Sequence, residues 1–256
     1  MMKTENLPRL LTGAAPARMI AVASGKGGVG KTWFAITLAH ALAMRGDRVL
    51  LFDGDLGLAN VDIQLGITPA ADLSAVISGR LSLDQAVLHH HGGFAILAGR
   101  SGSGALSSLG GAALERTLAA LRDASGQYDH VVLDLGAGLD SSVRRMSAFA
   151  DLLLVVATEE PTSLTDAYAV LKLHAADGGG EARIVVNQAT SRTNGERTHA
   201  TLARACKAFL GTTPRLAGII RRDDRVRDAI RRQTLLLERH PTSPAAADVE
   251  TLAAGL

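Results

Sequence analysis

The amino-acid sequence predicts a doubly wound α/β fold, in which a mostly parallel sheet carries helices on both faces. Short runs of β-branched and other apolar residues alternate along the chain with longer segments of helical periodicity. The short runs are apolar on both sides, which is typical of strands in a parallel sheet that is covered from both faces. With 256 residues, of which 47% are hydrophobic, the chain is long and apolar enough to bury one continuous core.

The expected elements follow in order. Strands are predicted at residues 19–24, 48–53, 93–99, 130–135, 151–158, 183–188 and 215–220. Helical patterns lie between them, for example over residues 33–46, which end at Gly46, and over residues 163–177, which open with Ser163. Residues 101–113 are rich in glycine and serine and predict a loop.

Composition favours one domain over residues 18–256, preceded by an N-terminal arm over residues 1–17. The formal net charge of +2 does not by itself indicate a nucleic-acid binder. Cys206 is the single cysteine, which excludes an internal disulfide and favours a buried thiol in a reducing cytosol. The sequence has no signal-peptide core and no run of roughly 20 apolar residues that could span a bilayer. We therefore expect a soluble, cytoplasmic protein.

Residues 24–32, SGKGGVGKT, predict a phosphate-binding loop. They fit the pattern G-x-x-x-x-G-K-[ST] between an apolar strand and a helix, which is the context that supports such a match. In such a loop Lys31 neutralises phosphate oxygens and Thr32 ligates Mg²⁺, while backbone N–H groups surround the phosphates. The pattern predicts ATP or GTP as cofactor with Mg²⁺, bound by Gly25, Lys26, Gly27, Gly28, Val29, Gly30, Lys31 and Thr32.

Acidic residues stand at the ends of two expected strands. Asp53 and Asp55 come at the end of strand 48–53, and Asp134 comes near the end of strand 130–135. Open α/β sheets bind their ligands at the carboxyl ends of strands, so these side chains are candidates for metal binding and catalysis. Aspartate is also common in turns for local reasons, and spacing alone leaves both interpretations open.

Lys26 is a second lysine in the same loop, and its segment KGGVGKT resembles the deviant Walker A loop of the MinD/ParA family of SIMIBI P-loop ATPases. The resemblance extends from about residue 17 to about residue 246. It implies a homodimer that forms on ATP binding, in which Lys26 reaches across to the partner's phosphates. In this respect Lys26 resembles an arginine finger supplied by a second subunit.

The same resemblance assigns roles to the three carboxylates. It implies that Asp55 positions or activates the attacking water, so that Lys26, Lys31 and Asp55 form the catalytic set. Asp53 would support the magnesium and lysine network, and Asp134 would hold Mg²⁺ through water. Leu135 stands where the family usually has a small polar residue or proline.

Asn187 ends the expected strand 183–188 and resembles the adenine-reading asparagine of the family. Its amide donates and accepts, which matches N6 and N7 of adenine and favours ATP over GTP. The N-K-x-D pattern typical of GTPases does not occur at this position. As a lone asparagine, Asn187 would equally suit a turn.

Within the family, segments 55–66, 95–102, 160–172 and 223–246 resemble the flagellar-number regulators, the FleN/FlhG group. This resemblance implies slow ATP hydrolysis that restrains flagellar gene activation or placement. The implied partners are a flagellar transcription regulator and a signal-recognition-type GTPase. Glu160 and Asp166 match residues at the dimer face, although an acidic first helical turn is also favoured by the helix dipole.

Two further features bear on alternatives. Six arginines could contact DNA, as in a ParA-type partition ATPase: Arg221, Arg222, Arg225, Arg227, Arg231 and Arg232. The aspartates interspersed among them favour instead a salt-bridged, solvated helix. Residues 247–256 carry Asp248 and Glu250 and neither lysine nor arginine, so they do not support membrane contact. Recruitment to the cell pole or the inner membrane face stays open. Three consecutive histidines at 89–91 predict a solvent-facing turn rather than a metal site.

Overall fold

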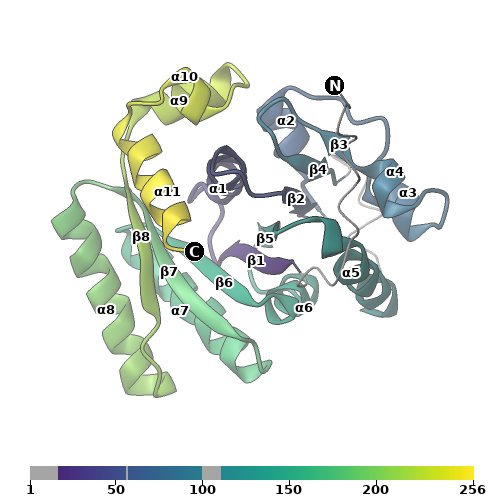
Figure 1. Cartoon of the computed structure of the whole chain (residues 1–256). Helices are drawn as coiled ribbons and strands as arrows, with labels where there is room; N and C mark the ends of the chain where they lie inside the picture. The colour runs from purple at the N-terminus through teal and green to yellow at the C-terminus, as the bar shows by residue number, and fades with distance from the viewer. Residues whose placement is uncertain (1–16, 56, 100–110) are drawn as a thin grey trace, which may run out of the picture.

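A computed structural model of the chain describes residues 17–55, 57–99 and 111–256 (Figure 1). In these ranges eight strands form one sheet in the order β3-β4-β2-β5-β1-β6-β7-β8. All the pairs are parallel except β3 and β4, which are antiparallel. The strands are β1 (Arg18–Ser24), β2 (Val49–Gly54), β3 (Leu88–His89), β4 (Ala95–Leu97), β5 (His130–Ala137), β6 (Leu152–Ala157), β7 (Glu181–Ala189) and β8 (Arg215–Arg221). The predicted fold class is confirmed.

Helices cover both faces of the sheet (Figure 1). One face carries α1 (Lys31–Met44), α2 (Val61–Leu65), α9 (Asp224–Arg231), α10 (Leu236–Arg239) and α11 (Pro244–Ala254). The other carries α5 (Gly111–Ala124), α6 (Ser141–Phe149), α7 (Pro161–Ala176) and α8 (Arg192–Leu210). Two short helices, α3 (Leu73–Ile77) and α4 (Leu83–Ala86), lie toward the β3–β4 edge, and a 3₁₀ turn, η1 (Ser125–Gln127), follows α5.

The core consists of two apolar layers, one on each face of the sheet. Ile20 and Val22 of β1 pack in the layer that contains α1, whereas Met19 and Ala21 pack in the layer that contains α5 and α6. Successive residues of a strand point to opposite faces, so a strand that is covered twice must be apolar throughout. This requirement explains the uninterrupted apolar runs in the sequence.

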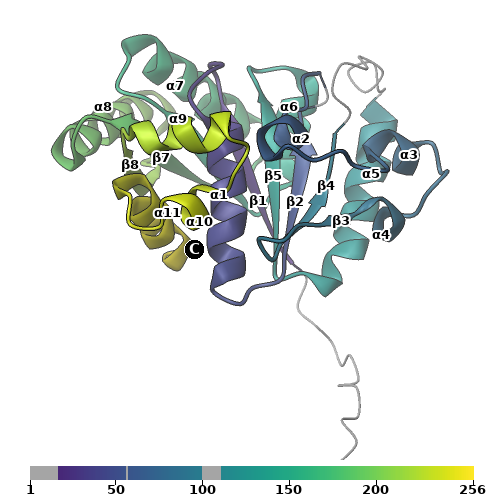
Figure 2. The same ribbon diagram turned by 90° about the horizontal axis from the view of Figure 1, so that it is seen from above.

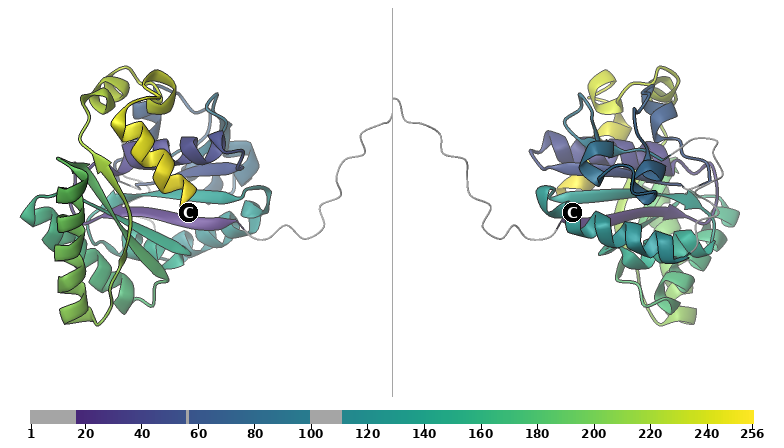
Figure 3. Two further views of the ribbon diagram at one scale, coloured as in Figure 1. Left: turned by 60° about the vertical axis from the view of Figure 1, so that its left-hand side comes forward. Right: turned by 90° about the vertical axis from the view of Figure 1, so that its right-hand side faces the viewer.

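The C-terminal helix α11 belongs to this core. It lies across the sheet face beside β8 and α1 (Figure 3). Its residues Ala245, Ala246, Val249 and Leu252 are buried. None of the helices in the described part of the chain is both long and apolar enough to cross a membrane. Residues 1–16 of the predicted N-terminal arm lie outside the described residues, so the domain boundary remains a prediction.

Some local predictions were wrong. Helix α7 begins at Pro161, two residues before Ser163, because proline suits the first helical turn. The Ser163 hydroxyl instead accepts a hydrogen bond from the backbone N–H of Thr158 at 3.0 Å. Residues 111–113 begin helix α5 instead of extending the predicted loop, and residues 101–110 of that loop lie outside the described range.

The expected solvent-facing turn at the three histidines is only partly right. His89 belongs to β3, a short antiparallel strand that was not predicted. His90 is buried and its ring stacks on Phe94 with 5.0 Å between ring centroids. His89 and His91 are exposed, His91 begins a turn, and its Nε2 lies 3.3 Å from a Glu238 oxygen. Cys206 is buried, as expected.

Candidate functional site

The phosphate-binding loop joins β1 to α1, whose first residue is Lys31. Gly30 precedes the helix in the left-handed region at φ 92°, and Gly28 has φ 79°. Both angles favour glycine, because other residues are strained there. The loop thus places the N-terminus of a 14-residue helix at the same edge of the sheet as Asp53 and Asp134. The first N–H groups of a helix have no partner within the helix and can bind phosphate oxygens.

Two glycines of the loop also allow close contacts with other elements. A Cβ atom on Gly25 would lie 2.4 Å from the backbone oxygen of Asp166 in α7, and one on Gly30 would lie 2.6 Å from Nδ2 of Asn187. Both distances are too short for any side chain. The loop is therefore packed between α7 and the end of β7, and its shape depends on both contacts.

Lys31 and Asp134 form the buried centre of the site. Burial lowers the pKa of the Lys31 amine, while the charges of Asp134 and Asp55 act in the opposite direction. Burial also raises the pKa of Asp134 to about 8, and the neighbouring Asp53 charge adds to this rise. The Thr32 side chain and the Lys31 charge act against this rise in pKa. Within the described residues, however, neither Asp134 oxygen has a hydrogen-bond partner at normal distance and angle. Such unpaired buried oxygens are rare and are characteristic of a site that receives a ligand or ion.

Asp53 organises the segment that follows β2. Its Oδ1 accepts a hydrogen bond from the Asp55 N–H at 3.3 Å, and its Oδ2 accepts from the Asn60 and Val61 N–H groups at 3.1 Å each. Burial raises the pKa of Asp53 to about 7, although these backbone donors counteract the rise. Asp53 therefore fixes the start of α2 while standing beside Asp134, with which it is paired in register.

Asp55 lies between the segment after β2 and the end of β5. Its Oδ1 accepts hydrogen bonds from the N–H groups of Gly57 at 3.3 Å and Leu58 at 2.9 Å. A Cβ on Gly136 would lie 3.3 Å from the same oxygen, so glycine there permits the close approach. Leu135, the departure from the family pattern, is buried and belongs to the core layer containing α5 and α6.

Lys26 lies at the surface of the loop and contacts its own chain. Its Nζ is 2.5 Å from Oε2 of Glu160 and 3.1 Å from Oγ1 of Thr162, both at the start of α7. The Lys26 side chain is 38% exposed and that of Glu160 is 64% exposed. The hydrogen bond and charge of Lys26 lower the pKa of Glu160. The two lysines of the loop therefore occupy different environments, one buried and one accessible.

Asn187 is bonded to the loop itself. Its Nδ2 donates to the Val29 carbonyl at 2.8 Å, and its Oδ1 accepts from the Gln188 N–H at 2.9 Å. It lines a cavity of about 300 Å³, together with Trp33, Arg222 and side chains of α9. Helix α9 shares this cavity with Trp33 near the start of α1, and α9 also contacts α2 (Figure 2). The cavity therefore opens beside the phosphate-binding loop.

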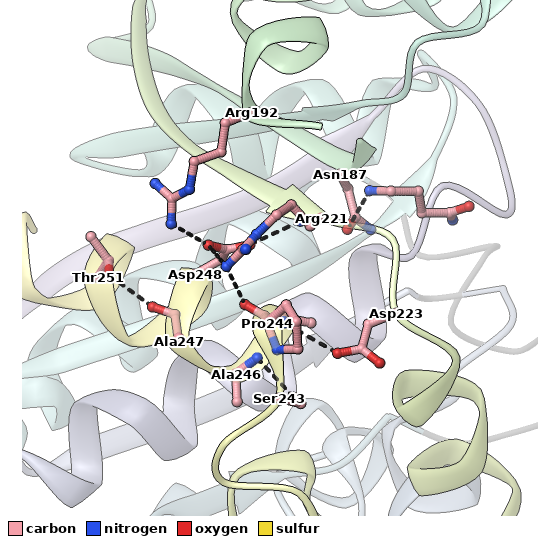
Figure 4. A network of polar contacts seen from close by, with 12 residues as sticks. Asn187, Arg192, Arg221, Asp223, Ser243, Pro244, Ala246, Ala247, Asp248 and Thr251 are labelled. Carbon is pink, nitrogen blue, oxygen red and sulfur yellow. Dashed lines mark hydrogen bonds and ion pairs between the residues drawn. The ribbon is translucent and has the colours of Figure 1, made fainter. Parts of the chain in front are cut away.

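An ion-pair network around the buried Asp248 fixes the rim of this cavity and was missed by the sequence analysis (Figure 4). Asp248 of α11 accepts hydrogen bonds from Arg221 Nε at 2.8 Å and Nη2 at 2.9 Å, and from Arg192 Nη2 at 2.7 Å. Its side chain is fully buried. In sequence Asp248 is simply an acidic residue near the end of the chain, and nothing nearby indicates partners 27 and 56 residues away.

The arginines of α9 are neutralised only in part. Asp228 binds Arg232 at 3.1 Å, and it also binds Arg239 at 2.6 Å and His240 at 2.9 Å, which lie beyond the predicted cluster. The predicted salt-bridged helix is therefore right only in part. The predicted cluster also contains exposed arginines for which we find no ion pair in the described residues: Arg222, Arg225, Arg227 and Arg231.

Comparisons with known proteins agree with this geometry. Residues 20–236 match the model of the CobQ/CobB/MinD/ParA nucleotide binding domain. The antiactivator FleN of Pseudomonas aeruginosa is 40% identical over 231 residues, which cover 90% of this chain and 82% of FleN. The flagellum site-determining protein YlxH of Helicobacter pylori is 28% identical over 207 residues, covering 81% of this chain and 70% of YlxH.

A solved structure shows the same fold. The septum site-determining protein MinD of Pyrococcus horikoshii, complexed with Mg-ADP, superimposes with a TM-score of 0.79 at 23% identity, covering 93% of this chain and 95% of MinD. The family match, the identity to FleN and the shared fold lead to one conclusion. This chain belongs to the MinD/ParA family of P-loop nucleotide-binding ATPases and, within it, is similar to the antiactivator FleN.

Proposed function

We propose that this protein is a dimeric switch that binds ATP, hydrolyses it slowly and thereby regulates flagellar number or placement. The main observation behind the proposal is that the two lysines of the phosphate-binding loop differ in burial and in partners. Lys31 is buried near Asp134 and Asp55, whereas Lys26 is accessible and paired with Glu160 at the surface. The buried lysine suits the chain's own nucleotide, and the accessible one suits the nucleotide of a second copy.

The loop and the adjacent cavity fit the two halves of ATP. Backbone N–H groups from Gly25 to Thr32 and the Lys31 amine hold the phosphates. The nucleoside lies in the 300 Å³ cavity, where Asn187 forms one wall. After its bonds to Val29 and Gln188, Asn187 retains one amide hydrogen and one carbonyl lone pair. These match the donor and acceptor on the edge of adenine.

The carboxylates fit a magnesium ion. Both oxygens of Asp134 are buried without a hydrogen-bond partner in the described residues, and a divalent cation would favour their ionised form. Thr32, Asp53 and Asp134 would hold Mg²⁺, directly or through water. When bound, Mg²⁺ neutralises charge on the phosphate oxygens.

Asp55 suits the positioning of the attacking water. Its carboxylate is oriented by the N–H groups of Gly57 and Leu58 and stands beside Gly136. A water held there attacks the γ-phosphorus as the bond to the bridging oxygen breaks, which yields ADP and phosphate. Lys31 stabilises the charge that develops on the phosphate oxygens.

Lys26 makes hydrolysis depend on a second copy of the chain. In the single chain its amine is engaged by Glu160 and Thr162. In the dimer Lys26 leaves these groups and contacts the partner's phosphates. Because Glu160 is exposed, this exchange involves little desolvation of the carboxylate. Dimerisation therefore reports that both sites hold ATP.

The relatives support the biological part of the proposal. One is described as an antiactivator and another as a flagellum site-determining protein. We place this protein in the cytoplasm, with a flagellar transcription regulator or a signal-recognition-type GTPase as its partner. Recruitment to the cell pole or the inner membrane face would then be the work of such a partner.

The biochemical proposal is tested with three alanine variants. Lys31→Ala should abolish ATP binding in calorimetry, because it removes the buried phosphate ligand. Asp55→Ala should bind ATP, fail to hydrolyse it and accumulate as a dimer. Lys172→Ala, which changes an exposed lysine on α7, is the matched control and should behave as wild type. Equal loss of ATP binding in Lys31→Ala and Asp55→Ala would contradict the separate roles.

The flagellar role is tested in cells that lack their own FleN-type regulator. Expression of the wild type should restore the normal number of flagella, counted by electron microscopy, whereas Lys31→Ala should not. A ParA-type partition role, which the relatives do not favour, predicts a different result. In that case ATP should cause salt-sensitive retention of DNA, through the exposed arginines of α9, and flagellar number should not respond.

A further inference from the structure

The cavity beside the phosphate-binding loop has a wall that the proposed function leaves unexplained. Trp33, the third residue of α1, lines it opposite α9. It is the single tryptophan of the chain. Its side chain is 6% exposed and belongs to the apolar layer that contains α1.

The indole nitrogen of Trp33 is the one polar atom of this side chain. This nitrogen is buried and has no hydrogen-bond partner among the described residues. Buried tryptophan N–H groups usually find an acceptor, and exceptions call for an explanation. An apolar residue such as phenylalanine would fill this position without burying an unpaired donor. The choice of tryptophan therefore points to an acceptor that arrives from outside the chain.

The cavity indicates where that acceptor comes from. Besides side chains of α9, its walls include Gly28 and Gly30 of the phosphate-binding loop, Asn187 and Arg222. A nucleotide whose phosphates occupy the loop places its nucleoside here. The purine ring and the ribose carry hydrogen-bond acceptors, and the flat indole offers the purine an apolar, aromatic surface.

We propose that Trp33 contacts the nucleoside of the bound nucleotide and that, with a turn of its ring toward the cavity, it donates its indole N–H to an acceptor on the nucleoside. This inference rests on the proposed nucleotide binding and adds a residue that distinguishes nucleosides from bare phosphates. Lys31 and the loop recognise the phosphates alike in ATP, ADP and inorganic tripolyphosphate. Trp33 responds only to the first two.

The first test uses the emission of the single tryptophan. ADP with Mg²⁺ is titrated into the wild type, and its binding is followed in parallel by calorimetry. The indole emission should change with the same dissociation constant as the heat. If calorimetry shows ADP binding while the emission stays constant, the inference is wrong and the proposed nucleotide binding stands. If calorimetry shows no ADP binding, both are overturned.

The second test removes the donor and keeps an aromatic ring. Trp33→Phe should bind ADP about tenfold more weakly than wild type, which corresponds to about 1.4 kcal/mol. Its affinity for inorganic tripolyphosphate, which lacks a nucleoside, should not change. Ile36→Val is the matched control, because it also shortens a buried side chain of α1 but lies outside the cavity wall. It should leave both affinities unchanged.

The comparison of the two ligands separates recognition from packing. A purely structural role for Trp33 would weaken ADP and tripolyphosphate binding by the same factor. Unchanged ADP affinity in Trp33→Phe would equally contradict the inference. If this variant fails to fold, the emission titration of the wild type still decides the question.

Discussion

Asp134→Asn should stabilise the ligand-free protein, and increasingly so at higher pH. Asp134 lies within β5, which continues to Ala137, and both of its oxygens are buried and unpaired within the described residues. An ionised carboxylate in this position is shielded from water and lacks a hydrogen-bond donor among the described residues. The folded protein therefore favours the protonated acid. Asparagine has nearly the same shape and cannot ionise.

The magnitude follows from the pKa. Burial raises the pKa of Asp134 from 3.8 to about 8. Since the folded state then binds the proton more tightly than the unfolded state, stability from this group is complete below pH 4. It falls as the pH rises toward 8 and then levels off. At about 1.36 kcal/mol per pH unit, the three units from pH 5 to pH 8 correspond to about 4 kcal/mol. Coupling to Asp53 and Lys31 reduces this, so we expect about 2–4 kcal/mol.

Urea unfolding at pH 5 and pH 8 measures this effect. The variant minus wild-type difference in unfolding free energy should grow by about 2–4 kcal/mol between the two pH values. Glu250→Gln, which changes an exposed carboxylate on α11, should run parallel to the wild type. Mg-ADP should stabilise the wild type more at pH 8 and affect the variant much less. Parallel pH curves for Asp134→Asn and wild type would refute the reasoning.

Three further variants test individual contacts. Asn187→Ala loses the bond to the Val29 carbonyl, so it should lower the unfolding free energy by about 1–2 kcal/mol and weaken ADP binding in calorimetry about tenfold. Asp248→Ala removes a buried carboxylate that accepts hydrogen bonds from Arg221 and Arg192, and because both arginines are partly exposed it should cost about 1–2 kcal/mol in urea unfolding. Glu160→Gln removes the charged partner of Lys26 at the surface and should change stability by less than about 1 kcal/mol while keeping the ATP-dependent dimer.

Each of these has an outcome that would contradict it. Asn187 would have no role in the loop if its alanine variant bound ADP as tightly as the wild type. Glu250→Ala, on the same helix as Asp248, serves as its control, and equal stability of the two variants would count against the network around Asp248. Loss of the dimer in Glu160→Gln would mean that Glu160 itself is needed at the interface.

Local patterns predicted the sheet and the loop well. Covered parallel strands must be apolar on both faces, so seven of the strands could be found from their composition, and β1 leads directly into the glycine-rich loop. Asp53 and Asp134 could be placed at one edge because parallel strands end there together. The two-residue strand β3 could not be found, since its pairing with β4 is a tertiary contact in a segment with little strand pattern.

Contacts between distant segments were outside the reach of sequence reasoning. The pairing of Lys26 with Glu160 joins residues 134 positions apart, and neither position alone indicates it. The bond from Asn187 to the loop depends on the placement of β7 beside β6, which lies between β7 and β1. The sequence pattern does not single out Trp33, because the lack of a partner for its indole nitrogen within the described residues is visible only in three dimensions.

Light scattering coupled to size exclusion tests the central claim most directly. The wild type and Lys26→Ala are each run with Mg-ADP and with Mg-ATP. The account predicts that the wild type is a monomer with ADP and a dimer with ATP, and that Lys26→Ala remains a monomer with both. A wild type that stays monomeric with ATP, at a concentration where calorimetry shows ATP bound, would contradict the switch.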